Sequence, residues 1–205
     1  MPAIGTTDID IVAQALVLIG LSPINSFGDD DKSAAAQTIY PMVKKEVLGR
    51  YPWRCTLVKK RLSRLSTAPN NEWTYAFQLP SDRMSGIRAV FNTDQPMARP
   101  IKEYDIYENT LLSNETSIWC DYQKDVSETQ FSPHLQVLMT YVLAARLAEI
   151  LTDDSSKAQN YQILAYGSPA EKAMGGYFEI ARSIDSQQRP SQEISGDFSL
   201  VDVRF

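Results

Sequence analysis

Apolar side chains are densest between Leu135 and Leu151, where the only polar positions are Gln136, Thr140, Arg146 and Glu149. On a helix at about 100° per residue, these polar positions fall within about half a turn of the wheel, together with several apolar ones. The segment is therefore apolar almost all round, which is typical of a helix buried on several sides or lying at a subunit contact. It is too short and too charged to span a membrane, which takes about 20 mostly apolar residues. We expect it to be the central helix of an α-helical core, starting at Ser132-Pro133.

A helical period predicts three further helices. The first starts after Thr6 or Thr7, which with Asp10 resembles a capping box, and ends near Ile19, before a glycine. The second spans 33–50 and should be kinked by Pro41, which lacks a backbone N–H. The last is expected over 155–186, after the central helix, and a Ser-Pro pair at 168–169 is able to kink or split it.

Between residues 55 and 123 the apolar period changes from helical to two, which predicts short strands separated by turns. We interpret this region as one β-meander inserted between the second and third helices. The first strand carries bases and no acid: Lys59, Lys60, Arg61 and Arg64. By contrast, residues 101–131 carry seven acidic and two basic side chains. Alternating bases favour a solvated or inter-subunit strand over a single phosphate-binding face.

These patterns predict a mainly α fold of the α+β kind: a four-helix bundle with an inserted β-meander and an extended C-terminal arm. Helices 1 and 2 occupy 1–54, the β-rich insertion 55–131, helices 3 and 4 residues 132–187, and the arm 188–205. The arm begins where Pro190 stops the helical signal. It is polar apart from spaced large apolar residues, which include Phe198, Leu200, Val203 and Phe205. Such a segment is typical of a docking arm that adds to a partner's sheet edge or lies in a groove.

Composition and charge bear on the class of protein and on where it is made. The chain has 205 residues and a formal net charge of −5, which argues against a general nucleic-acid binder. Its first residues lack the basic region of a signal peptide, and its two cysteines are far apart in the sequence. We therefore expect a cytosolic origin and reduced thiols.

Motifs for catalysis or metal binding are missing from the sequence. The only histidine, His134, lies at a helix start, and no sequence near it resembles a nucleophile elbow. Cys55 and Cys120 lack the spacing of a zinc site, and the three aspartates at 29–31 are better explained by helix capping and solvation than by a metal. We expect no enzyme activity and no cofactor, although paired carboxylates of a hydrolase would meet only in three dimensions.

Three motifs follow one another in a recognisable order. Leu18–Ile24 ends the first helix, Val47–Trp53 ends the second with Tyr-Pro-Trp, and Tyr75–Asp82 ends a strand with Leu-Pro-Ser-Asp. Together they resemble the tail tubular protein A family, the head-to-tail adaptors of tailed and mainly short-tailed bacteriophages. The resemblance covers about residues 8–185. Pro41 and the Gly175-Gly176 pair depart from the straight helices expected of the family.

The resemblance implies a structural virion protein, assembled in the host cytoplasm, that forms a ring of about twelve copies. Such a ring lies under the portal, carries the tail nozzle and encloses a channel for genome DNA without sequence-specific binding or a membrane. The central helix would contribute to the subunit interface through Met139, Val142, Leu143, Leu147 and Ile150. The alternatives are a virion-associated cell-wall hydrolase and a small helical DNA-binding protein.

Overall fold

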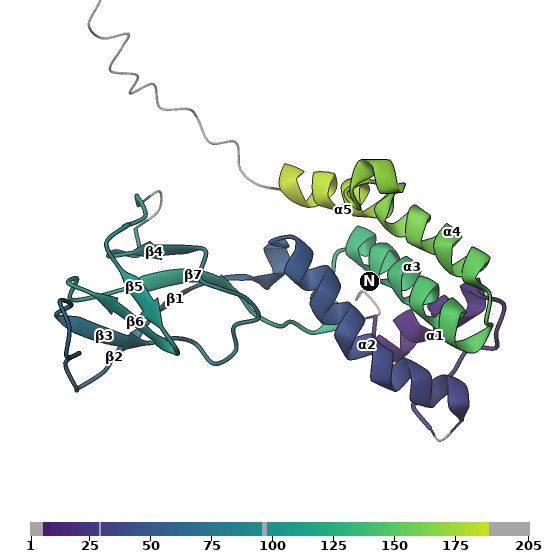
Figure 1. Cartoon of the computed structure of the whole chain (residues 1–205), viewed down its shortest axis with the longest axis horizontal. Coiled ribbons are helices and arrows are strands. Elements are labelled where there is room, and N and C mark those ends of the chain that lie inside the picture. The colour runs from purple at the N-terminus through teal and green to yellow at the C-terminus, as the bar shows by residue number, and fades with distance from the viewer. Residues whose placement is uncertain (1–5, 29, 96–97, 189–205) are drawn as a thin grey trace, which may run out of the picture.

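The computed structural model describes residues 6–28, 30–95 and 98–188, which form a helical lobe and a β lobe along the long axis of the molecule (Figure 1). The helices are α1 (Asp8–Leu18), α2 (Asp31–Arg50), α3 (Pro133–Leu151), α4 (Ser155–Tyr166) and α5 (Gly176–Gln187). The 3-10 turns are η1 (Arg54–Thr56), η2 (Glu128–Gln130) and η3 (Pro169–Glu171). The strands are β1 (Leu57–Arg61), β2 (Ser63–Arg64), β3 (Tyr75–Gln78), β4 (Ala89–Phe91), β5 (Asp105–Tyr107), β6 (Thr110–Ser113) and β7 (Trp119–Gln123).

The predicted four-helix bundle is wrong, because the described chain has five α-helices and seven strands in two antiparallel sheets, an α+β fold. The predicted last helix divides into α4 and α5. Gly167 ends α4 with a φ of 82°, and Ser168 and Glu171 then close a capping box around η3. A Cβ on Gly176 would lie 2.3 Å from the carbonyl oxygen of Leu164. The chain can therefore return against α4 only with a glycine at this position.

The helix α3 lies at the centre of the helical lobe and packs against α1, α2, α4 and α5. This confirms the predicted central helix, which starts with a serine cap at Ser132. In contrast to the expectation from sequence, α3 is long and apolar enough to span a membrane by length and composition, the one such helix in the described ranges. Its burial among four neighbouring helices identifies it as the core helix of this lobe.

The β lobe consists of two sheets in place of the single predicted meander. One has the strand order β1-β7-β4 and the other β2-β3-β6-β5, and every pairing is antiparallel. The chain passes from one sheet to the other at Leu62, between β1 and β2. The two sheets enclose a small core: Leu62, Phe77, Leu79, Val90, Leu111, Ile118, Cys120 and Tyr122.

Buried polar contacts join the two lobes. Gln123, at the end of β7, is buried, and its Nε2 donates to the backbone oxygens of Leu48 (3.2 Å) and Tyr51 (2.9 Å). On the other side of the junction, the backbone N–H of Arg54 donates to the carboxylate of Asp185 in α5 at 3.2 Å. The Gln123 bonds satisfy carbonyls that the end of α2 leaves open, and the Arg54 bond ties the start of η1 to α5. Together they fix the direction in which the β lobe leaves the helical lobe.

Candidate interaction surfaces

The strand β1 and its continuation β2 form a basic edge, which we define as Lys59, Lys60, Arg61 and Arg64. Three of these cations lie over aromatic rings of other strands in the same sheet. The distances from the cation to the ring centroid are 4.1 Å for Lys59 and Phe91, 5.3 Å for Arg61 and Trp119, and 4.2 Å for Arg64 and Tyr75. Stacking of this kind holds the cationic groups in place while leaving them accessible. All four bases are exposed, as the prediction of a solvated or inter-subunit strand requires.

Asp121 lies on the central strand β7, opposite Lys59 of β1 and Ala89 of β4. Its Oδ1 has no hydrogen-bond partner among the residues that the structure describes. Burial raises the pKa of this carboxyl, and the charges of Lys59 and Arg88 oppose that rise. Asp121 therefore places a negative charge beneath the basic edge without forming a close ion pair there.

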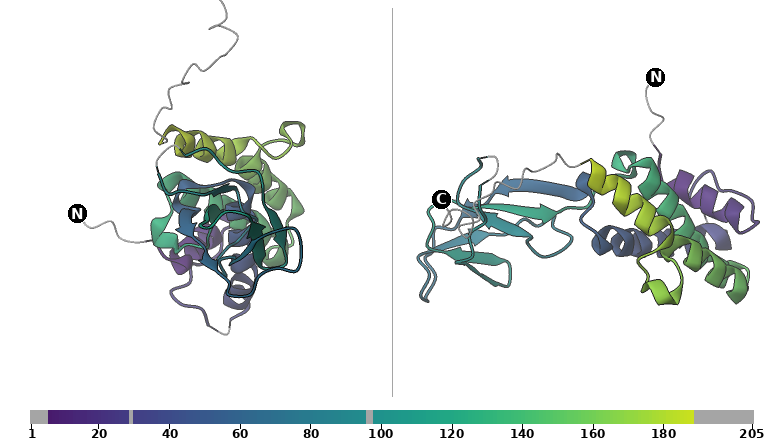
Figure 2. Two further views of the ribbon diagram at one scale, coloured as in Figure 1. Left: turned by 90° about the vertical axis from the view of Figure 1, so that its left-hand side faces the viewer. Right: turned by 90° about the horizontal axis from the view of Figure 1, so that it is seen from above.

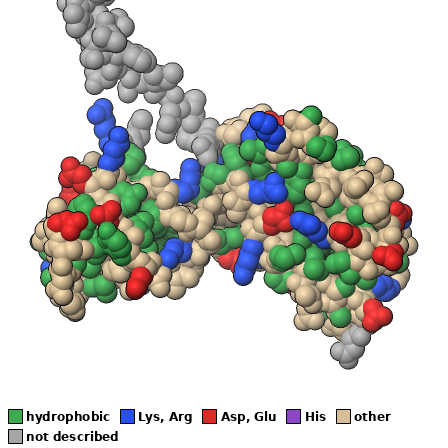
Figure 3. Space-filling model, viewed as in Figure 1, with side chains coloured by type: hydrophobic (Ala, Val, Ile, Leu, Met, Phe, Trp, Pro, Cys, Tyr) green, Lys and Arg blue, Asp and Glu red, His purple; other side chains and the backbone are tan. Residues whose placement is uncertain are grey.

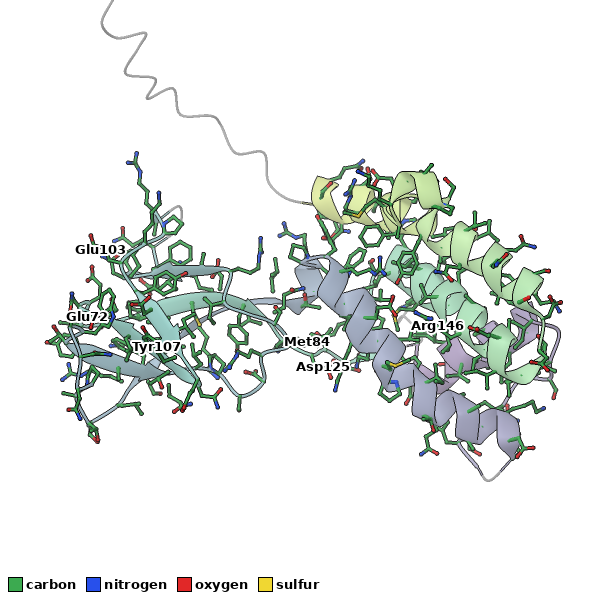
Figure 4. The ribbon with its side chains drawn as sticks, viewed as in Figure 1. Glu72, Met84, Glu103, Tyr107, Asp125 and Arg146 are labelled. Carbon is green, nitrogen blue, oxygen red and sulfur yellow. The ribbon has the colours of Figure 1, made fainter. Side chains whose placement is uncertain are left out.

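The opposite edge of the four-stranded sheet is acidic, and we define this acidic edge as Glu103, Asp105 and Glu108. It contains β5, whose Ile106 and Tyr107 are 42% and 58% exposed. Figure 3 shows an apolar area with acidic side chains around it on this part of the β lobe, where Figure 4 labels Tyr107. Asp105 is held by Trp73, whose Nε1 donates to Oδ2 at 3.0 Å. This arrangement is suited to contact with a basic partner surface.

The helical lobe carries an apolar groove of about 450 Å³ between α1 and α3. Val17, which is 56% exposed, and Val137 line it, together with Leu18 and Tyr141. In the sequence, Ile9, Val12, Leu16 and Ile19 form one apolar stripe at a helical period. Val17 lies off that stripe, and this was the one signal in the sequence that could have revealed the groove.

The α3 residues that the sequence assigned to a subunit interface differ in how exposed they are. Met139, Val142, Leu143 and Leu147 of α3 are 2% exposed or less and belong to the subunit's own core. Ile150, by contrast, is 50% exposed and can reach a neighbour. The arm residues Phe198, Leu200, Val203 and Phe205 lie outside the described residues.

The histidine and the two cysteines considered for catalysis or metal binding lie on three different elements, α3, η1 and β7. His134 is exposed at the start of α3, and burial raises the pKa of the Cys55 and Cys120 thiols to about 11. At neutral pH these thiols are protonated and therefore poor nucleophiles. Within the described ranges, no group of three His, Cys, Asp or Glu side chains is placed to hold a metal ion.

No protein-family model and no curated protein sequence matches the chain. The three motifs behind the resemblance now have places in the fold. Val47–Trp53 forms the end of α2 and the first residues of the junction, and Trp53 is fully buried with its Nε1 donating to the carbonyl of Val47 at 2.9 Å. Tyr75–Asp82 contains β3, and Leu18–Ile24 follows α1 beside the groove.

Proposed function

We propose that this chain is a structural head-to-tail adaptor of a tailed bacteriophage, which forms a ring between the portal and the tail nozzle. The observation that carries this proposal is the ordered set of motifs shared with the tail tubular protein A family, at 18–24, 47–53 and 75–82. Two of them build the junction and the β lobe, so they belong to the parts that set the shape of the subunit. The ring has about twelve copies and acts as a scaffold in the neck of the virion.

Large apolar side chains exposed on both lobes support a role in assembly. Val17 and Ile150 are exposed on the helical lobe, and Ile106 and Tyr107 on the β lobe. A subunit of a ring that also binds a portal and a nozzle needs several separate contact surfaces, and apolar patches of this kind mark such contacts.

The acidic balance of the chain supports a channel through which DNA passes without being held. A formal net charge of −5 gives little attraction to phosphate, whereas a protein that neutralises several phosphates binds DNA tightly. DNA contact in the adaptor is therefore transient and independent of sequence.

The portal contact is assigned to the C-terminal arm, 188–205, through Phe198, Leu200, Val203 and Phe205. Each buried Phe or Leu contributes about 1.5–3 kcal/mol, and a ring multiplies this contribution through its many copies. A chain that ends at Arg189 should keep the helical circular dichroism and melting temperature of the full chain but lose portal binding.

Sedimentation of the chain mixed with the cognate portal protein tests the proposal, with the chain ending at Arg189 as the matched variant. The full chain should migrate with the portal at a fixed ratio of copies, and the shortened chain should not. Unchanged portal binding by the shortened chain would contradict the arm's role. Unfolding of the shortened chain would instead show that the arm packs on its own subunit.

A further inference from the structure

The β lobe carries opposite charges on two opposite edges. Residues 57–65 hold four bases and no acid, whereas residues 101–108 hold three acids and one base, Lys102. In the four-stranded sheet, β2 and β5 occupy the two outer positions of the order β2-β3-β6-β5. Arg64 lies on β2, at the edge opposite β5, and Lys59, Lys60 and Arg61 lie on β1, an outer strand of the three-stranded sheet. In the view from above, the β1 arrow lies along one side of the lobe and the teal hairpin strands along the other (Figure 2).

Within the part of the chain that the structure describes, the charges of these edges form no ion pairs. The close ion pairs among the described residues join α2 to residues 125–128 and link groups within the helical lobe. None of them includes a side chain of the basic edge or of the acidic edge. Lys60, Arg64, Glu103 and Glu108 are all exposed, so their charges are available to another molecule.

Apolar surface accompanies the charge on both edges. Ile106 and Tyr107 are exposed among the acids, and Leu65 is 37% exposed beside Arg64. The aliphatic stems of lysine and arginine cover apolar side chains while their charged ends reach carboxylates. The two edges therefore carry opposite charges, and both place exposed apolar side chains beside those charges.

We propose that the basic edge of one copy docks on the acidic edge of the next copy, which joins the β lobes of the adaptor ring head to tail. This inference rests on the ring proposed above and identifies the surfaces that close it. Contacts between two different patches of the same chain are heterologous, and they form a ring when the rotation closes. Opposite charges also disfavour contacts between two like edges and so set the direction of assembly.

Charge reversal of each edge tests the contact on portal rings viewed by electron microscopy. In the first variant, Lys60→Glu, Arg61→Glu and Arg64→Glu leave three acids and one base on the basic edge, so both edges are acidic. In the second, Glu103→Lys and Glu108→Lys make both edges basic. Each variant alone should lose complete rings because like charges meet at every contact. The control Lys45→Glu with Lys172→Glu, which changes exposed lysines of the helical lobe, should form rings like the wild type.

Mixing the two variants in equal amounts gives the sharpest result. An acidic edge of the first variant then meets a basic edge of the second at every contact, so alternating copies should form complete rings again. This mutual rescue requires that oppositely charged edges meet at the contacts, and it also shows that both variants are folded. A chain that carries all five substitutions has the two charges exchanged and should likewise form rings by itself.

Complete rings from either single-edge variant would overturn the inference while leaving the adaptor function standing. Absence of rings from the wild type would instead contradict the adaptor function itself. A filter-binding assay with double-stranded DNA covers the other possible partner of the basic edge. If the first variant has weaker DNA binding but intact rings, the basic edge binds DNA and not a second copy.

Discussion

The two lobes divide stability and recognition between them. The helical lobe and the junction share one cluster of 27 buried apolar residues, whereas the core of the β lobe has eight. The ion pairs of the described residues also lie in the helical lobe and at the junction, while the charges of the β-lobe edges stay unpaired. A small sheet lobe of this kind depends on what it packs against. The helical lobe therefore supplies most of the folding free energy, and the β lobe presents surfaces that a partner can complete.

Replacing a tryptophan in each lobe tests this division most strongly. Trp53→Ala removes a fully buried ring that packs edge-on to Phe178 and should lower the free energy of unfolding by about 3–5 kcal/mol. Trp73→Ala, in the β lobe, removes a half-buried ring with one hydrogen bond to Asp105, and should cost clearly less. Urea denaturation followed by circular dichroism measures both. Equal losses would mean that the β lobe contributes as much stability as the helical lobe.

The turn between α4 and α5 should be the next most sensitive position of the helical lobe. Gly176 has a φ of 58°, and a Cβ there would meet the carbonyl oxygen of Leu164 at 2.3 Å, so Gly176→Ala should cost about 1–3 kcal/mol. Gly49→Ala provides the control, since Gly49 is helical and a Cβ there meets nothing within 4 Å. That control should stabilise the protein by about 0.5–1 kcal/mol. If Gly176→Ala leaves the thermal unfolding temperature unchanged, the close approach of the chain to α4 at this turn is wrong.

The junction should depend on Gln123 more than on other glutamines. Gln123→Leu leaves the carbonyls of Leu48 and Tyr51 without this donor, and should cost about 1–3 kcal/mol. Gln78→Leu serves as the control, because Gln78 is exposed and its amide bonds only to carbonyls near the surface. Hydrogen exchange should also show faster opening of the β lobe in Gln123→Leu. Equal effects of the two substitutions would argue against a junction that fixes the lobes.

The smallest effect is expected from Asp121→Asn and should depend on pH. Burial raises the pKa of the Asp121 carboxyl, so the folded state binds more protons than the unfolded state just above the unfolded pKa, which is about 3.9. Wild-type stability should therefore fall as pH rises through this window, and Asp121→Asn should remove that fall. Because the site is partly exposed, the difference at neutral pH should stay within about 0.5 kcal/mol. A wild type that gains stability from this group as pH rises would reverse the sign and contradict the account.

Local patterns predicted the elements better than they predicted their assembly. The capped start of the first helix and the central helix could both be inferred, because capping and helical period depend on neighbours in sequence. The Ser-Pro pair at 168–169 indicated that the last helix could split, but the return of α5 against α4 was missed, because it depends on the close approach of Gly176 to α4. The two sheets were missed for a similar reason, since the pairing of β1 with β7 joins residues far apart in the chain.

The candidate surfaces show the same limit. The basic first strand could be identified from its four bases, and the excess of acids after residue 100 was also visible in the sequence. Their placement on opposite edges follows only from the order of the strands. The expected interface residues of α3 show a different limit of the sequence. An apolar surface all round predicts burial, but it does not tell which of Met139 or Ile150 is covered by the same subunit.

Electron microscopy of the full chain bound to its cognate portal tests the adaptor function most directly. Class averages viewed along the channel should show a closed ring of this chain with rotational symmetry, joined through the β lobes. A mixture in which the chain stays unbound, or binds without cyclic order, would contradict the account.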